Sequence, residues 1–207
     1  MYFPTLKRLL DILAATALLV LLMPVIALVW LAVRLVLGGP VFYATERAGR
    51  HGRPIVLVKF RTMTNATGPD GRLLPDAQRL TPVGNFLRRT SLDELPQLAG
   101  VVVGDMSMVG PRPLPLRYVA RYSPRQAERL RVLPGLTGWA QIHGRNAVDW
   151  PRRLELDARY VEMLGRWYAP FVDLFIVVCT IMQLGWAAIT GRGIAAPGSA
   201  TMHEFNP

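Results

Sequence analysis

The sequence predicts an α+β protein, mainly helical, in which a long apolar N-terminal helix precedes a small domain with a single β-hairpin. Three observations lead to this fold class. Ile12–Val33 carries no charged side chain, Val41–Thr45 and Ile55–Phe60 are β-prone runs joined by Arg- and Gly-containing residues, and Thr81-Pro82 and Ser123-Pro124 are helix start signals. The chain therefore reads as an apolar helix, then a hairpin, then short helices.

The composition limits the class of protein. The chain has 207 residues, of which 51% are hydrophobic, and a formal net charge of +10. This length suits one domain, or one domain with an appendage. A chain that is both apolar and strongly basic is typical of proteins that meet lipid headgroups, nucleic acid or phosphate-bearing substrates. Because Cys179 is the single cysteine, an internal disulfide and a thiolate metal cluster are excluded.

The first apolar run is long enough to cross a bilayer, but two features argue against a simple span. Pro24 lies at its middle, where proline removes a helix hydrogen bond and clashes with the preceding turn. Basic residues also flank both ends, whereas a spanning helix has its cations on one side. We therefore weigh a bent, re-entrant helix equally against a kinked span. The flanking cations are Lys7 and Arg8 before the run and Arg34, Arg47, Arg50 and Arg53 after it.

The C-terminal half contains a predicted helix and a second apolar run. The helix is expected from Pro151 to about Trp167, with Glu155 and Arg159 spaced to pair at i,i+4. Phe171–Ile189 is apolar and is either a second span or a helix lying in the membrane interface, which we favour because it holds an Asp near one end. The tail from residue 191 is rich in Gly, Ala and Pro and is expected to be extended.

The stretch Arg88–Leu98 sets two adjacent carboxylates, Asp93 and Glu94, just after two arginines. Ser91 and Glu94 have the spacing of a capping box, which predicts a helix starting at Ser91. In that interpretation Glu94 only reaches back to a backbone N–H, and Asp93 only sits in the positive field of a helix N-terminus. The alternative is that the two carboxylates carry chemistry.

Cationic side chains recur beside turns. Any one of them could simply be solvated, but Arg112 is held between Pro111 and Pro113, a rigid setting for a merely solvated cation, and the Gly-rich stretch 134–146 resembles a ligand-lining loop. His143 has no second His or Cys at ligand spacing and is interpreted as structural or surface. The recurring cations are Lys59, Arg61, Arg88, Arg89, Arg112 and Arg145.

A carboxylate pair among arginines suits phosphoryl chemistry. One carboxylate can attack phosphorus and hold an aspartyl-phosphate intermediate, while arginines and a divalent metal neutralise the transferring group. Mg²⁺ needs only one or two protein carboxylates when substrate phosphates supply further oxygens. The sequence has no Walker A loop, no Gly-x-Gly-x-x-Gly fingerprint and no His-Glu-x-x-His helix, so it offers no support for ATP-driven, dinucleotide or zinc-protease chemistry.

Together these segments resemble the monotopic bacterial phosphoglycosyl transferases, the bacterial sugar transferase family. The resemblance covers nearly the whole chain: an N-terminal KRLLD before a proline-broken apolar helix, then KFRTM, RRTSLDELPQL, GDMSMVGPRP, PGLTGWAQIHGRN and RLELDARYV in that order. The compact length is similar to the small type of the family. The closing GSATMHEFNP resembles the tail of enzymes that transfer phospho-N,N'-diacetylbacillosamine.

The resemblance implies a reaction in which a UDP-sugar gives its phosphosugar to undecaprenyl phosphate and UMP is released. It implies that Asp93 is the nucleophile of a ping-pong cycle and that Glu94 is its partner, placing Mg²⁺ or assisting proton transfer; which of the two binds the metal more closely stays open. By the same resemblance the phosphate-binding positions are Lys59, Arg88 and Arg112, the nucleotide-sugar positions are Gln141 and Arg145, and Asp157 is a weaker candidate.

The resemblance also implies an arrangement. Residues 1–38 are expected to form a re-entrant membrane anchor broken at Pro24, residues 39–190 an interfacial catalytic domain with Pro111 as a structural residue, and residues 191–207 an extended tail. The expected location is the cytoplasmic face of the bacterial inner membrane. The expected partners are a UDP-sugar, undecaprenyl phosphate and membrane lipid, with no nucleic acid and with a homodimer left open.

Two departures from the family pattern bear on these expectations. Met23 stands where the family often has Ser before the proline, and His143 stands where Asn or Ser is frequent. The donor is therefore open: UDP-N,N'-diacetylbacillosamine comes first, with UDP-galactose, UDP-glucose and their N-acetylated forms as alternatives. Two readings from other classes remain, a basic membrane-surface binding protein without catalysis and a conventional glycosyltransferase that releases UDP.

Overall fold

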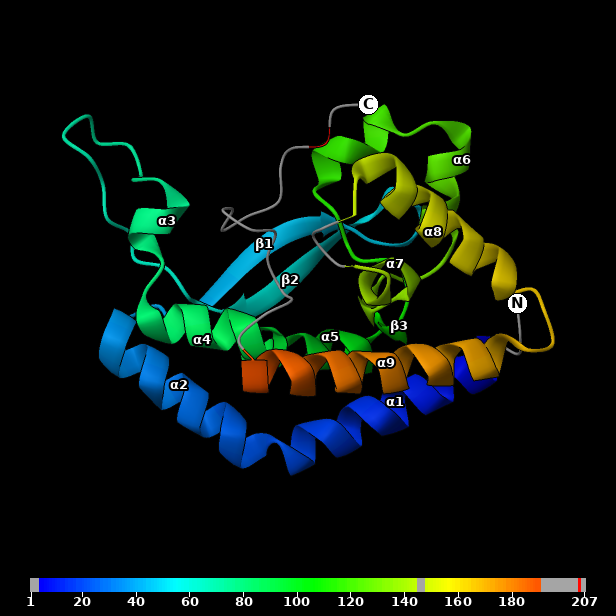
Figure 1. The fold of residues 1–207 in the computed structure, drawn as a ribbon, viewed down its shortest axis with the longest axis horizontal. Helices are drawn as coiled ribbons and strands as arrows, with labels where there is room; N and C mark the ends of the chain where they lie inside the picture. Colours follow the sequence, from blue (N-terminus) through cyan, green and yellow to red (C-terminus); the bar gives the residue numbers. More distant parts are fainter. Residues whose placement is uncertain (1–3, 145–147, 191–204, 206–207) are drawn as a thin grey trace.

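The N-terminal segment forms two apolar helices joined at a sharp bend. A computed structural model describes residues 4–144, 148–190 and 205. In it α1 (Pro4–Leu21) and α2 (Met23–Leu37) meet at an angle of 62°, with Pro24 in the first turn of α2. Because proline has no N–H to continue the helix, the break predicted at Pro24 is confirmed. Figure 1 shows the pair as a shallow V whose apex points away from the rest of the chain.

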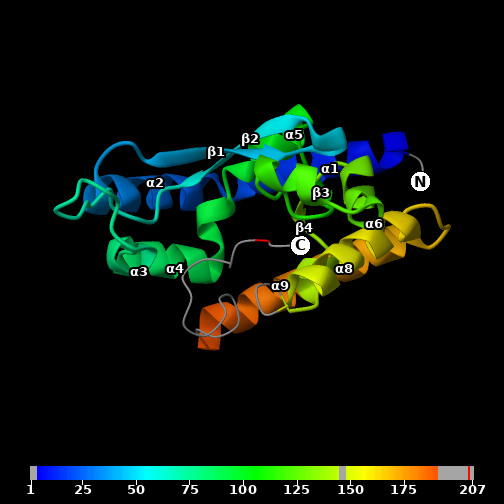
Figure 2. The ribbon, with the colours of Figure 1, turned by 90° about the horizontal axis from the view of Figure 1, so that it is seen from above.

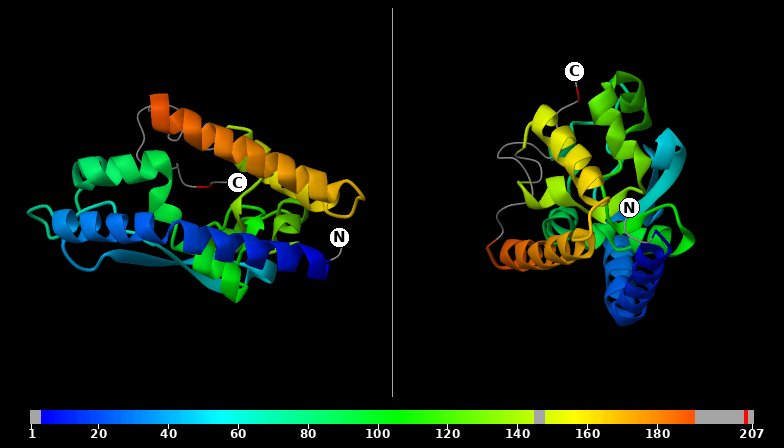
Figure 3. Two further views of the ribbon diagram at one scale, coloured as in Figure 1. Left: turned by 90° about the horizontal axis from the view of Figure 1, so that it is seen from below. Right: turned by 90° about the vertical axis from the view of Figure 1, so that its right-hand side faces the viewer.

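The second apolar run is a single helix, α9 (Ala169–Thr190). It is long and apolar enough to cross a membrane, and only 17% of its most apolar stretch of 18 residues is buried. Figures 1 and 3 show α9 at the same end of the molecule as α1 and α2. Large exposed apolar side chains gather on these three helices, among them Leu13, Leu21, Leu28, Trp30, Leu35, Phe171, Leu174, Ile181, Trp186 and Ile189.

A buried polar network ties α1 and α9 to the remaining structure. Lys7 Nζ donates to Asp173 Oδ2 at 2.8 Å, and the Tyr160 hydroxyl donates to Asp173 Oδ1 at 2.7 Å. Asp11 accepts hydrogen bonds from the Ser107 hydroxyl and the Met108 amide at 2.6 and 3.2 Å. Burying these charges is tolerable only because each one is paired.

Two details of the sequence interpretation are thereby corrected. Lys7 is 9% exposed and paired, and Arg8 donates to the carbonyls of Val101 and Val102 at 2.7 and 2.9 Å, so neither cation is a free flank of the apolar helix. Asp173 is likewise a buried partner of Lys7 rather than the polar edge of an interfacial helix. The charges needed for these pairs lie far away in the sequence, which is why the local pattern misassigned them.

The predicted hairpin is confirmed and its first strand is longer than expected. Strands β1 (Phe42–Ala48) and β2 (Pro54–Phe60) are antiparallel, with Tyr43 opposite Lys59 and Arg47 opposite Ile55. Side chains alternate between the two faces of a strand, so this register puts Arg47 and Lys59 on the same face. A short 3-10 turn, η1 (Arg50–Gly52), connects the strands.

The helices that carry the dyad follow the hairpin. After α3 (Asp76–Arg79), α4 (Pro82–Thr90) starts as predicted, with the Thr81 hydroxyl accepting from the Gly84 amide at 3.0 Å. A helical turn does start directly after Ser91, as predicted, but the predicted capping box is wrong, because Ser91 also ends α4 with a positive φ of 57° and its side chain makes no capping hydrogen bond. The chain continues as η2 (Leu92–Glu94) and α5 (Gln97–Val103).

The remaining elements form the second half of the domain. Strands β3 (Ser107–Val109) and β4 (Gly135–Thr137) are parallel. The chain between them forms three short helices: η3 (Leu116–Arg121), α6 (Pro124–Ala127) and η4 (Glu128–Arg131). They are followed by α7 (Trp139–Ile142) and α8 (Trp150–Met163), which starts as expected but ends before Trp167. Figure 2 shows the hairpin on one side of the molecule and α8 with α9 on the other.

Two sequence-predicted pairings in this half are confirmed. Ser123 and Gln126 form a capping box that starts α6, so the start signal at Ser123-Pro124 was correct. Arg159 Nε donates to Glu155 Oε1 at 2.9 Å, one turn apart on α8. The mainly helical α+β class with one hairpin therefore agrees with the structure.

Candidate active site

The adjacent carboxylates lie on the one-turn helix η2, between α4 and α5. The positive φ at Ser91 turns the chain after α4, and this turn directs Asp93 inward, where it is 4% exposed, while Glu94 is half-buried. Lys59 arrives from β2, Arg88 from the last turn of α4, and Arg112 from the loop after β3. Three separate parts of the chain thus meet around the dyad.

Glu94 is held by a two-pronged ion pair with Arg112. Arg112 Nη2 and Nη1 donate to Glu94 Oε1 and Oε2 at 2.5 and 3.3 Å. The Glu94 charge raises the pKa of Arg112 above its ordinary value. Such a planar fork fixes both groups in orientation, and buried Pro111 and Pro113 fix the backbone on either side of Arg112. This pairing replaces the capping box expected for Glu94.

Asp93 is in a different electrostatic situation. Burial, and then the nearby charge of Glu94, raise the pKa of Asp93 from 3.8 to about 6, against the opposing effects of Lys59, Arg88 and Arg112. No hydrogen bond joins its carboxylate to another residue within the described ranges. A desolvated carboxylate that is weakly committed to protein partners is suited to attack an electrophile.

The surrounding cations leave the site with a net positive charge. Burial lowers the pKa of Lys59, an effect that Asp93 and Glu94 partly offset. Arg88 Nε donates to the buried Thr62 hydroxyl at 3.0 Å, which fixes the guanidinium beside the dyad. With three cations against two carboxylates, the site is electrostatically complementary to an anion such as a phosphate.

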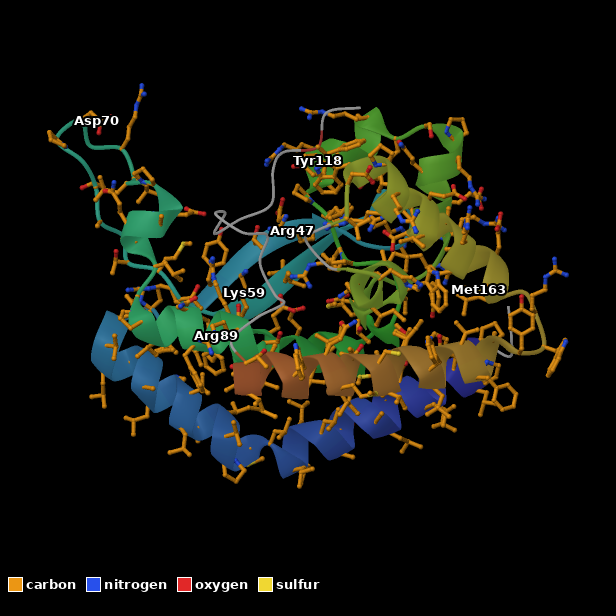
Figure 4. All side chains as sticks on the ribbon, viewed as in Figure 1. Arg47, Lys59, Asp70, Arg89, Tyr118 and Met163 are labelled. Atoms are coloured by element: carbon orange, nitrogen blue, oxygen red, sulfur yellow. The ribbon has the colours of Figure 1, made fainter. Side chains whose placement is uncertain are left out.

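Arg47 lies near Arg112, although the sequence pointed to it only as a cation that follows the first apolar run and not as a site residue. It lies on β1, where the strand register puts it on the same face as Lys59, and Figure 4 labels both residues on the hairpin. Its pKa is lowered by burial and then by Arg112 and Arg117. Its Nε is buried without a hydrogen-bond partner among the residues described. The strand alternation of the hairpin could have indicated this side chain, because it places every second residue of β1 on the face that carries Lys59.

Asp157 has no hydrogen bond to these cations or to the dyad among the described residues. It is linked to Arg112 through Arg129. Its Oδ2 accepts from Arg129 Nη2 and Nε at 2.9 and 3.1 Å, in a pair whose side chains are both 2% exposed. Arg129 Nη2 also donates to the carbonyl of Arg112 at 2.6 Å. Asp157 therefore supports the backbone of the residue that holds Glu94, whereas direct substrate contact by Asp157 stays a prediction.

Two other predicted residues belong to the stretch after β4. Gln141 Nε2 donates to the carbonyl of Leu136 at 3.0 Å, and its Oε1 is buried with no partner in the described part of the chain. Arg145 lies outside the described residues. His143 Nδ1 is 2.8 Å from the carbonyl of Trp139 and its ring contacts the Trp139 ring, in agreement with a structural role.

An apolar groove adjoins the dyad. It lies between α2 and α4, has a volume of about 510 Å³, and is lined by apolar side chains that include Val25, Ala32, Val83 and Phe86. Leu92, the residue before Asp93, forms part of its wall. The groove thus extends from the apolar helix α2 to the residue that precedes the dyad in the chain.

The dyad also fits a magnesium ion bound together with a phosphate. Across the described ranges, no cluster of three or more His, Cys, Asp or Glu side chains could hold a metal by itself. Two carboxylates are nevertheless the usual protein share of a Mg²⁺ site when substrate oxygens complete the coordination. Since both Glu94 oxygens already accept from Arg112, Asp93 has the more available oxygens.

Comparison with known proteins identifies the family. Residues 2–186 match the family model described as bacterial sugar transferase. The uncharacterized sugar transferase EpsL of Bacillus subtilis is 45% identical over 200 residues, which cover 97% of this chain and 95% of EpsL. The exopolysaccharide production protein ExoY of Rhizobium meliloti is 40% identical over 192 residues, with 84% of this chain and 83% of ExoY covered.

Relatives with a stated reaction are longer proteins. The UDP-glucose:undecaprenyl-phosphate glucose-1-phosphate transferase of Escherichia coli is 42% identical over 197 residues, 86% of this chain but 40% of that protein. The undecaprenyl-phosphate galactose phosphotransferase of Salmonella typhimurium is 38% identical over 179 residues, 78% of this chain and 37% of that protein. With nearly its whole length matched by the family model and by EpsL, the chain is a member of the bacterial sugar transferase family.

Proposed function

We propose that this transferase moves a phosphosugar from a UDP-sugar to undecaprenyl phosphate and releases UMP. The observation that carries the proposal is the buried Asp93 carboxylate, ringed by Lys59, Arg88 and Arg112 and placed one residue beyond the wall of an apolar groove. A site that is cationic at one end and apolar at the other matches a polyprenyl phosphate. The undecaprenyl-phosphate transferases among the relatives support the same reaction.

The mechanism we propose has two displacements at one phosphorus atom. An Asp93 carboxylate oxygen attacks the phosphorus that bears the sugar, the bond to the bridging oxygen breaks, and UMP leaves. A phosphate oxygen of undecaprenyl phosphate then attacks the same phosphorus, which releases the Asp93 carboxylate and yields the polyprenyl diphosphosugar. Neither step requires a net proton transfer. The main task of the protein is therefore to orient the two substrates and to neutralise the charge on the transferring phosphoryl group.

The cations divide this task. Lys59 and Arg88 are close enough to Asp93 for their charges to oppose the rise in its pKa, and they would stabilise the charge that builds on the transferring phosphoryl group. Arg112 holds Glu94 in place through their ion pair and adds its positive charge to the site. Mg²⁺, held by Asp93 and Glu94 together with donor phosphates, would supply further charge neutralisation at the phosphoryl oxygens.

We further propose that α1 and α2 form a re-entrant anchor in the inner membrane, with the catalytic part on the cytoplasmic face. The 62° bend and the exposed apolar side chains of both helices support this topology. The prenyl chain would follow the groove between α2 and α4, which places its phosphate beside Asp93. The basic net charge would favour the anionic headgroup surface.

The proposed donor is UDP-N,N'-diacetylbacillosamine, with UDP-glucose and UDP-galactose as alternatives that the names of relatives favour. The first choice depends on the closing residues of the chain. Of these, Phe205 is described and is 2% exposed, with its ring against Tyr118, Tyr122 and Trp150. A panel of UDP-sugars decides the donor: inactivity with the bacillosamine donor and turnover with glucose or galactose would reverse the order.

Product analysis tests the reaction class. We expect purified protein in lipid nanodiscs to release UMP, and the Asp93→Asn variant to release none while folding normally. Release of UDP would identify a conventional glycosyltransferase. A graded loss of lipid binding on removing any arginine, with no turnover in the unmodified protein, would identify a basic membrane-surface binding protein instead. The control is Asp149→Asn, because Asn retains the oxygen that caps α8 and makes the same change in net charge.

Cysteine labelling tests the topology. In a Cys179→Ala background, cysteines introduced at Thr5 and at Arg50 lie on the two sides of the bent pair. A re-entrant anchor leaves both of them protected from an impermeant reagent until the cells are opened. Labelling of only one of them from outside intact cells would establish a true crossing.

A further inference from the structure

Gln97 carries a buried amide without a partner. It is 3% exposed, and its Nε2 has no hydrogen-bond partner within the described residues. Buried polar groups are nearly always hydrogen-bonded, and an unsatisfied buried donor is costly. Gln183, by contrast, donates from Nε2 to the carbonyl of Ile142 at 2.8 Å. Among the described residues, the buried side-chain atoms without a partner also include the Nε atoms of four arginines and Gln141 Oε1, and Gln97 Nε2 is the amide donor of this set. Its hydrogen is therefore available to an acceptor that is not part of the chain.

The backbone places Gln97 next to the dyad. η2 ends at Glu94, and Leu95 and Pro96 keep right-handed helical angles (φ −53°, ψ −37° and φ −60°, ψ −21°) up to Gln97, the first residue of α5. Helical residues three and four apart lie side by side, with Cβ atoms about 5–6 Å apart. The bonds across this junction are of the i→i+3 kind, from Leu95 N to Leu92 O at 3.4 Å and from Leu98 N to Leu95 O at 3.1 Å. Gln97 thus lies one tightly wound turn beyond Glu94 and four residues after Asp93.

The chemistry of the neighbouring carboxylate suggests the acceptor. Lys59, Arg88 and Arg112 come from β2, from α4 and from the loop after β3, whereas Gln97 begins α5 and is separated from the dyad only by Leu95 and Pro96. This short helical connection would limit its movement relative to a group attached to Asp93. A neutral amide can donate a hydrogen bond to phosphoryl oxygens. Unlike a further cation, it does not add a positive charge that would make the Asp93 carboxylate less nucleophilic. These are the properties needed in a donor to a phosphoryl group.

We infer that the Gln97 side-chain amide donates a hydrogen bond to a non-bridging oxygen of the phosphoryl group while that group is attached to Asp93. The inference rests on the proposed function. It makes Gln97 a substrate-contacting residue of the phosphosugar intermediate, and it explains why an amide is kept in a buried position without a protein partner.

The test is the variant Gln97→Met, which keeps nearly the same shape and removes the amide. We expect the rate of adduct formation, measured in a single turnover at saturating UDP-sugar by intact-protein mass spectrometry, to fall about tenfold to a hundredfold. The melting temperature should stay the same or rise by a few degrees, because an unsatisfied buried amide is removed. A residue with a purely structural role would not give this combination.

The matched control is Gln126→Met, which removes half of the capping box of α6. There we expect the opposite pattern, a lower melting temperature with an unchanged rate of adduct formation. If Gln97→Met does not fold, Gln97→Asn replaces it, because Asn keeps the amide but withdraws it by one methylene. A rate within twofold of the unmodified protein in the folded Gln97 variant would overturn the inference.

The outcomes separate this inference from the proposed function. If the unmodified protein forms an adduct that Asp93→Asn lacks, and Gln97→Met matches the unmodified protein, the role of Gln97 is refuted and the function stands. If the unmodified protein forms no adduct at all, the covalent mechanism and the role of Gln97 are both refuted, and UMP release then decides the reaction class separately.

Discussion

The buried Asp93 carboxylate should make the active protein less stable than the inactive Asp93→Asn variant. Burial and the Glu94 charge raise its pKa from 3.8 to about 6, so the folded state prefers the protonated carboxyl. Because this pKa is higher in the folded than in the unfolded state, the contribution of Asp93 to the free energy of unfolding is complete below about pH 4. It is lost as the pH rises through about 6. Replacing Asp93 by Asn, which is neutral at every pH and similar in shape, removes this loss.

The magnitude follows from the size of the shift. One pKa unit corresponds to 1.36 kcal/mol, so a rise of about 2 units corresponds to about 3 kcal/mol of unfolding free energy at neutral pH. For a chain of this size, 1 kcal/mol moves the melting temperature by about 2–4 °C. Asp93→Asn is therefore expected to melt up to about 10 °C higher than the unmodified protein at pH 7.5, and at the same temperature at pH 4.

Thermal unfolding in nanodiscs at a fixed scan rate from pH 4 to pH 8 measures this difference. Asp149→Asn is the matched control, because it makes the same change in charge at an exposed cap and should melt within about 1 °C of the unmodified protein at each pH. Equal melting temperatures for Asp93→Asn and the unmodified protein at pH 7.5, or a less stable variant there, would refute the reasoning about the buried carboxylate.

Three further substitutions probe the supports of the site by thermal unfolding and turnover. Asp157→Ala removes the acceptor of two Arg129 hydrogen bonds together with the counter-charge of that buried guanidinium, and should cost about 3–5 kcal/mol and lower turnover; unchanged stability would show that the pair is dispensable. Lys7→Met removes the ammonium group that forms an ion pair with buried Asp173, with a similar expected loss, and an increase in melting temperature would contradict it. Phe205→Ala empties the pocket that the ring fills and should cost about 3–5 kcal/mol, whereas a change below 1 kcal/mol would mean that the ring is not held there.

The fold was predictable where its determinants are local. Thr81 and Ser123 each precede a proline and cap the following helix, Pro24 breaks the apolar segment, and β-prone runs on both sides of a turn form the hairpin. In these cases the residue types themselves fix the backbone, by a missing N–H, a capping oxygen or strand propensity. The order of these elements could therefore be inferred with no knowledge of tertiary contacts, whereas the parallel pair of β3 and β4 depends on long-range hydrogen bonds and was not predicted.

The site was predictable only in part, because its contacts are long-range. Ser91 and Glu94 have capping-box spacing, yet Ser91 ends one helix and Glu94 pairs with Arg112, 18 residues away. The partner of Lys7 is 166 residues away, so a flanking-charge interpretation could not find it. The family resemblance gave Asp93 and the cations around it, but not the burial that leaves the Gln97 amide without a partner.

The covalent step at Asp93 is tested most directly by mass spectrometry. Nanodisc-bound protein is incubated with the UDP-sugar without acceptor, its intact mass is measured, and peptides are mapped. We predict a mass increase equal to one phosphosugar, located on Asp93 and lost when undecaprenyl phosphate is added. Unchanged mass together with normal turnover, or normal turnover by Asp93→Ala, would contradict the mechanism.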